Sequence, residues 1–110
     1  MVNHPWTPAH QAVESRDYEE LTRLLDRGVD PGEVCCGQTL LIHAIELEGD
    51  SALQSGGELN SVLTAILLAY GANPFETIDG GGTPLEMAAS YDHVLAERLI
   101  MRWSRNVVQD

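Results

Sequence analysis

Three segments of the sequence open in the same way, and this repetition limits the possible folds more than any other feature. They read TPAHQA at 7–12, TLLIHA at 39–44 and TPLEMA at 83–88. A glycine turn follows the first two, RGVDP at 27–31 and YGANP at 70–74. Thr7 and Gly28 are 21 residues apart but Thr39 and Gly71 are 32 apart, so the second unit carries about 11 extra residues. Without them the period is about 33, which is typical of units that bury their apolar faces by stacking.

Each repeated segment carries the signals of a helix start. A threonine before a helix can cap its first turn, and a proline at the first helical position lacks an N–H that would otherwise need a partner. Thr7-Pro8 and Thr83-Pro84 fit this pattern, while Leu40 replaces the proline in the middle unit. The sequence therefore predicts helices that begin just after Thr7, Thr39 and Thr83.

A second helix is predicted in each unit from leucines that recur on one face. Gly28 and Gly71 follow the first two of these helices, where a left-handed C-terminal turn favours glycine. The apolar positions of the three second helices are Leu21, Leu24 and Leu25; Leu63, Ile66 and Leu67; and Leu95, Leu99 and Ile100.

Together these motifs resemble the ankyrin repeat, whose signature is T-P-L-H-x-A, a Gly-His turn, a leucine-rich second helix and Gly-Ala-Asp/Asn. The segments TPLEMAA at 83–89 and LLAYGANP at 67–74 are close matches, and the resemblance covers about residues 5–103. It implies an all-α ankyrin-repeat solenoid, a single domain over residues 1–110. Its three helix-turn-helix repeats would span about 5–37, 38–81 and 82–104.

The sequence departs from the family pattern at two turns. Arg16 and Asp92 stand where the signature has the glycine of its Gly-His turn. Arginine tolerates a left-handed backbone less well than aspartate does, so we expect the first turn to be reshaped. The signature histidine survives as His10, which we expect to be a structural hydrogen-bonding residue.

The extra residues of the middle unit lie at about 47–59, with the sequence LEGDSALQSGGEL. Glycines, serines and acids predict a mobile surface loop. One interpretation is a neutral insertion at a tolerant site. The other is an acidic arm that contacts a partner beside the binding groove.

Charge narrows the class of partner. The chain has 17 acidic residues against six basic ones, all arginine, and a net charge of −11. Such a charge disfavours nucleic acid and anionic membranes and favours a basic protein. Eleven acids and no basic residue lie between Arg27 and Arg98, so we expect much of the acidity to border one groove. They are Asp30, Glu33, Glu46, Glu48, Asp50, Glu58, Glu76, Asp79, Glu86, Asp92 and Glu97.

No segment of the sequence predicts membrane insertion or export. The longest apolar run, residues 62–70, is interrupted by Thr64 and is far short of a membrane span. Residues 1–10 lack a basic start and an apolar stretch, so we expect no signal peptide and a cytoplasmic location.

Catalytic and metal-binding motifs are weak. The adjacent Cys35 and Cys36 lack the spacing of a zinc site, and we expect two reduced thiols. GGGT at 80–83 lacks the lysine of a phosphate-binding loop. We therefore expect no enzyme activity, no metal and no cofactor. The alternative is an enzyme or pathway accessory with a small-molecule pocket in the groove, using His43, Glu46 or Cys36 for proton transfer.

The resemblance implies that hairpin tips and first helices form a concave surface that binds other proteins. Trp6 and Tyr91 are the aromatic anchors, although either could instead pack as a lid. Carried onto this sequence by repeat register, the predicted partner-binding residues are His4, Trp6, Glu14 and Ser15; Cys36 (beside Cys35), Gln38, Glu46 and Leu47; and Ile78, Asp79, Ser90 and Tyr91.

Small ankyrin proteins of this kind resemble bacterial immunity proteins, which neutralise a toxin such as a nuclease with a basic cleft. A basic protein, including such a toxin, is thus the expected partner, and mimicry of nucleic-acid phosphates is a third alternative. The last helix combines Arg98, Arg102 and Arg105 with Met101 and Trp103. We interpret it as a solubilising cap on a monomer, with self-association through Trp103 and Met101 as the alternative.

Overall fold

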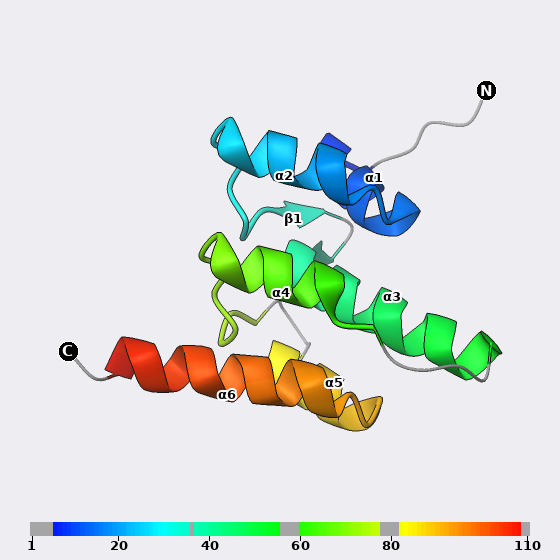
Figure 1. Ribbon diagram of the computed structural model, residues 1–110, viewed down its shortest axis with the longest axis vertical. Coiled ribbons are helices and arrows are strands. Elements are labelled where there is room, and N and C mark those ends of the chain that lie inside the picture. Colours follow the sequence, from blue (N-terminus) through cyan, green and yellow to red (C-terminus); the bar gives the residue numbers. More distant parts are fainter. Residues whose placement is uncertain (1–5, 36, 56–59, 78–81, 109–110) are drawn as a thin grey trace.

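The computed structural model consists of three helix pairs stacked one upon another (Figure 1). It describes residues 6–35, 37–55, 60–77 and 82–108. The first pair is α1 (Pro8–Ser15) and α2 (Tyr18–Asp26), the second is α3 (Leu40–Ser55) and α4 (Val62–Ala69), and the third is α5 (Pro84–Ser90) and α6 (Val94–Val108). A short antiparallel hairpin of β1 (Val34–Cys35) and β2 (Gln38–Thr39) joins the first pair to the second.

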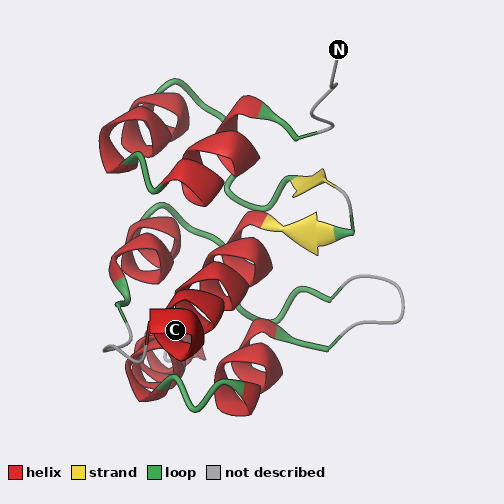
Figure 2. Ribbon diagram, turned by 90° about the vertical axis from the view of Figure 1, so that its right-hand side faces the viewer, coloured by secondary structure: helices red, strands yellow, loops and turns green. Residues whose placement is uncertain are grey.

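The helices form two layers. The first helices of the pairs, α1, α3 and α5, make one layer, and the second helices, α2, α4 and α6, make the other (Figure 2). The central helix α3 contacts α1, α4 and α5. The all-α solenoid expected from the repeats is therefore present.

Threonine caps begin the three first helices, as predicted. Thr7 Oγ1 accepts a hydrogen bond from the N–H of His10, and Thr39 Oγ1 accepts one from Ile42, both at 3.1 Å. Thr83 Oγ1 accepts from the N–H of Glu86, whose carboxylate in turn accepts from the N–H of Thr83 at 2.8 Å. This reciprocal pair satisfies two backbone donors at the start of α5.

The glycine turns are also confirmed, because Gly28 and Gly71 have φ values of 106° and 100°. The expectation of a reshaped first turn was wrong: Arg16 adopts a left-handed conformation, with φ 56°, as Asp92 does with φ 57°. The N–H groups of Arg16 and Asp17 bond to the carbonyls of Val13 and Ala12 at 3.0 and 2.9 Å. These bonds close the end of α1 and offset the cost of placing an arginine in this conformation.

The insertion is helical where a loop was expected. Helix α3 continues through residues 47–55, and residues 56–59 lie outside the described part of the chain. Local propensity does not favour this helix, because Gly49, Asp50 and Ser51 follow one another. Long-range contacts stabilise it: Glu48 is buried against Thr64 of α4 and against His93, which directly precedes α6, and Gly49 lies against Tyr91.

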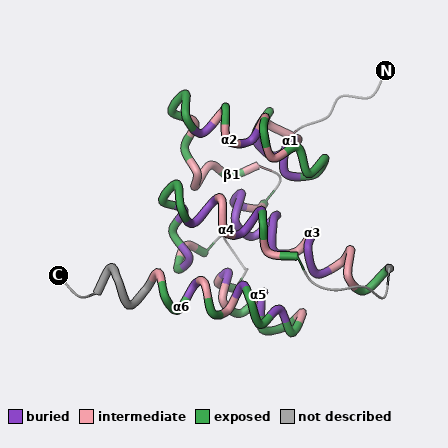
Figure 3. The backbone as a smooth tube through the Cα atoms, viewed as in Figure 1, coloured by how far each residue is buried: buried purple, intermediate pink, exposed green. Residues whose placement is uncertain are grey.

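The core lies between the two layers, where each helix presents buried residues (Figure 3). Its fully buried side chains include Val13, Leu21, Ile45, Leu67 and Ile100. Leu95 was expected on the buried face of α6 but is 49% exposed, and the smaller Ala96 occupies the buried position beside it.

Within the part of the chain that the structure describes, none of the helices combines the length and hydrophobicity needed to cross a bilayer.

Candidate functional site: an open acidic groove

A groove of about 370 Å³ runs between α1 and α3 and is bordered by the hairpin. Three carboxylates line it, and none of the arginines whose side chains are described does. The described residues of the lining are Trp6, Glu14, Gln38, His43, Glu46, Leu47, Asp50, Ser51 and Gln54.

Most of the groove comes from one face of α3. His43, Leu47, Asp50 and Gln54 are three or four residues apart, so their side chains project from the same side of the helix. The continuation of α3 past residue 46 therefore supplies four of the nine described lining residues. A loop at 47–55 would not hold these side chains in register.

His43 forms part of the groove wall. Its side chain is only 5% exposed, and its ring lies 5.2 Å from that of Trp6 and 5.6 Å from that of His10, measured between centroids. His43 Nε2 donates a hydrogen bond to Glu14 Oε1 at 2.9 Å. His43 Nδ1 is buried and has no hydrogen-bond partner among the residues that the structure describes.

The other two carboxylates are also held by side chains from different elements. Gln38 of β2 donates its amide N–H to Glu46 Oε1. The hydroxyl of Tyr91, at the end of α5, donates to Asp50 Oδ1 at 2.8 Å. An imidazole, an amide and a phenol thus orient the three acids, and none of the arginines whose side chains are described pairs with any of them.

Tyr91 supports the groove from outside its lining. Its ring packs directly on Gly49, where an added Cβ would lie 2.3 Å from Tyr91 Cγ. Burial, the hydrogen bond to Asp50 and the negative charges of Asp50 and Glu46 raise the pKa of Tyr91 to about 12. The phenol therefore stays protonated and keeps donating to Asp50 at neutral pH.

The structure brings together five of the predicted partner-binding residues: Trp6, Glu14, Gln38, Glu46 and Leu47 line the same groove. Trp6 is half-buried against His43 of the second pair.

Three other predicted residues lie elsewhere. Ser15 accepts a hydrogen bond from Gln11 on its own helix, Ser90 donates to the carbonyl of Met87, and Tyr91 makes the contacts described above. Four predicted residues lie outside the described residues: His4, Cys36, Ile78 and Asp79.

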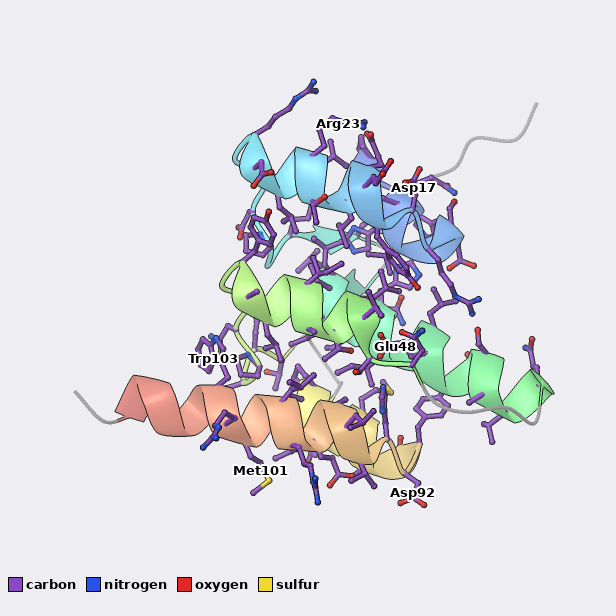
Figure 4. All side chains as sticks on the ribbon, in the orientation of Figure 1. Asp17, Arg23, Glu48, Asp92, Met101 and Trp103 are labelled. Atoms are coloured by element: carbon purple, nitrogen blue, oxygen red, sulfur yellow. The ribbon has the colours of Figure 1, made fainter. Side chains whose placement is uncertain are left out.

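The acidity is less concentrated in the groove than expected. Of the acids between Arg27 and Arg98 whose placement is described, Glu46 and Asp50 line it, and Glu14 from α1 joins them. Glu48 projects the other way and is 4% exposed between the second and third pairs (Figure 4). The register of an unbroken α3, which the sequence did not indicate, separates Glu48 from its acidic neighbours.

Glu48 forms a buried hydrogen-bond network that sequence reasoning missed. Its Oε1 accepts from Thr64 Oγ1 at 2.7 Å and from His93 Nε2 at 2.8 Å, and its Oε2 accepts from the N–H of Thr64 at 3.2 Å. Burial is the largest influence and raises the pKa of Glu48, although these hydrogen bonds oppose the shift. The one available signal was His93, which directly follows the turn residue Asp92 and so matches the histidine of the Gly-His signature.

The structural role predicted for His10 is confirmed. His10 Nε2 donates to the carbonyl of Gln38 at 3.0 Å, and His10 Nδ1 lies 2.8 Å from Thr7 Oγ1. Burial lowers the pKa of His10, and the bond to the Gln38 carbonyl opposes this shift. His10 therefore connects the start of α1 to the hairpin before α3.

The C-terminal helix presents two different surfaces. Trp103 points toward α4, where it borders a shallow apolar groove of about 230 Å³ and meets the ring of Phe75 at 6.3 Å. Met101 points away from the molecule and is 59% exposed (Figure 4). Trp103 and Met101 thus do not form one continuous patch, and self-association through them stays a prediction.

Stacked helix pairs joined by a hairpin define a helical repeat protein. No protein-family model matches the sequence, and no curated protein matches it. Among solved structures, the chain is similar to an ankyrin repeat domain from Acinetobacter baumannii AYE, with a TM-score of 0.73 and 30% sequence identity. The match covers 91% of this chain and 48% of that one, so the chain spans about half the length of its structural neighbour. The chain belongs to the ankyrin-repeat family, whose domains are generally protein–protein interaction modules.

Proposed function

We propose that this chain is a non-catalytic binding protein whose acidic groove captures a basic protein. One observation carries the proposal: Glu14, Glu46 and Asp50 converge on one groove, and none of the arginines whose side chains are described lines it. A site that folding leaves with uncompensated negative charge is complementary to a positively charged surface.

The fixed positions of these carboxylates support a binding role for the groove, rather than acidity that merely reflects the composition of the chain. Each accepts a hydrogen bond from another element, so little side-chain entropy remains to be lost when a partner arrives. Complementary charge also accelerates encounter and disfavours acidic competitors. The association rate should therefore fall as salt is added.

The small-molecule alternative has less support. His43 and Glu46 do line the groove, as that alternative requires, and Cys36 lies outside the described residues. However, ligand pockets are usually enclosed and mostly apolar, with a few polar groups. This groove is half open and exposes somewhat more polar than apolar surface, which favours a protein surface as its occupant.

The resemblance to immunity proteins suggests a toxin with a basic cleft as the first partner to test. Co-expression of the chain with a toxin encoded beside it should protect cells and yield a complex. Cells that die despite abundant folded chain would contradict the toxin assignment and leave the groove to be tested with other basic proteins.

The experiment that tests the groove compares two triple variants with the same change in net charge. The groove variant is E14Q/E46Q/D50N; the control, E19Q/D92N/E97Q, removes three acids that do not line the groove. Each is immobilised, the captured host proteins are identified, and association rates with the purified partner are measured at two salt concentrations. We expect the groove variant to slow association about tenfold at low salt and the control to stay within about twofold. Equal rates for both variants would contradict the proposal.

A further inference from the structure

The proposed capture of a basic protein leaves open which cationic side chain enters the groove. We propose that it is an arginine of the partner, whose guanidinium is held between Trp6 and the carboxylates of α3. This inference rests on the proposed function and adds the chemistry of the group that is recognised.

The groove offers mainly hydrogen-bond acceptors. The carboxylates of Glu14, Glu46 and Asp50 are acceptors when ionised, and one of the two amide N–H groups of Gln38 is already donated to Glu46. Arginine matches such a lining because it presents five N–H donors and no acceptor.

The shape of the groove favours arginine over lysine. Glu46 and Asp50 are four residues apart on α3, so their Cβ atoms are about 5–6 Å apart and can bracket one planar fork. Trp6 adds an aromatic surface to the same groove. A guanidinium stacks on such a surface and pairs with carboxylates in a bidentate way, whereas the lysine ammonium is a compact and strongly hydrated charge.

The test uses the 110-residue chain with Trp103→Phe, which leaves Trp6 as its only tryptophan. The probes are the N-acetyl amides of arginine, lysine and citrulline; citrulline has nearly the shape of arginine without its charge. Tryptophan fluorescence is followed as each probe is added. In unsubstituted protein labelled with ¹⁵N, the indole N–H signal of Trp6 gives the same readout if Trp103→Phe impairs folding.

We expect saturable binding of the arginine probe, about fivefold tighter than the lysine probe, and no saturation with citrulline. E46Q/D50N should weaken arginine binding about fivefold or more, and its matched control E19Q/D92N should change it less than twofold. Equal binding of arginine and lysine, both weakened by E46Q/D50N, would overturn the arginine assignment and leave the acidic groove standing. Binding that E46Q/D50N does not change would overturn both.

Discussion

Replacing Gly49 by alanine should destabilise this protein, although the same change stabilises most exposed helices. Alanine in a helix interior is more favourable than glycine by about 0.5–1 kcal/mol. At Gly49 the added Cβ would lie 2.3 Å from Cγ and 2.4 Å from Cδ1 of Tyr91. Carbon atoms normally stay about 3.5–4.0 Å apart, so the ring must move by more than about 1 Å.

The cost follows from what the ring gives up when it moves. Overpacking costs about 1–3 kcal/mol, and loss of the 2.8 Å bond from Tyr91 to Asp50 adds about 1 kcal/mol. After subtraction of the helix-propensity gain, G49A should lower the free energy of unfolding by about 1–3 kcal/mol. In a Tyr91→Gly background both the ring and Tyr91 Cβ, which would lie 2.9 Å from the added Cβ, are absent. The same substitution should then raise that free energy by about 0.5–1 kcal/mol.

Urea unfolding of the wild type, G49A, Y91G and the double variant, followed by circular dichroism, measures this change of sign. The reasoning would be refuted if G49A stabilised the wild type, or if it had the same effect in both backgrounds. Either result would mean that the third repeat does not pack on the extension of α3.

Three further predictions concern titrating groups. Glu48→Gln should lower the free energy of unfolding by about 1–3 kcal/mol at pH 7, and Glu19→Gln should change it by less than about 0.5 kcal/mol. Burial raises the pKa of Glu48 in the folded protein above its ordinary 4.5. The contribution of Glu48 to the free energy of unfolding is therefore fully present below pH 4.5 and is lost as pH rises through the folded pKa. The deficit of E48Q relative to wild type should therefore be larger at pH 4 than at pH 7, and a smaller deficit at pH 4 would contradict this. Absorbance titration should show one phenol, Tyr91, with a pKa of about 12, and Asp50→Asn should shift it back toward 10. NMR titration should give His10 a pKa below its ordinary 6.5, because burial disfavours the charged imidazole. The contribution of His10 to stability is therefore present above pH 6.5 and is lost as pH falls through the lower folded pKa. A measured pKa at or above 6.5 would contradict this prediction.

The capped helix starts and the glycine turns, which depend on short-range signals, were predictable from the sequence. Thr7 and Thr83 act on backbone N–H groups three residues away, and Gly28 and Gly71 act through their own φ angles. Such effects need no knowledge of the rest of the chain, so pattern and propensity suffice.

The long α3 was not predictable in this way. Its second half contains residues that favour turns, and it is helical because of partners far along the chain: Thr64, His93 and Tyr91. The same contacts explain why Glu48 is buried while Asp50, two residues later, faces the groove. Without the helical register, the sequence shows only a run of acids.

The candidate site was predictable only in part, because some of its residues depend on the register of α3. Trp6, Glu14, Gln38 and Glu46 lie at repeat positions that the family resemblance transfers directly. His43 was considered only as a proton-transfer group of the alternative function, and Asp50 was attributed to a loop. Their place in the groove depends on the face of α3 that packs beside α1.

The measurement that tests the central claim most directly is a map of backbone amide chemical shifts in the ¹⁵N-labelled chain as a nona-arginine peptide is added. The account predicts that the largest changes fall on the end of α1 at Glu14 and on α3 between His43 and Gln54, and that E14Q/E46Q/D50N removes them. Changes confined to α6 around Met101, or spread evenly over all acidic surfaces and unchanged in that variant, would contradict it.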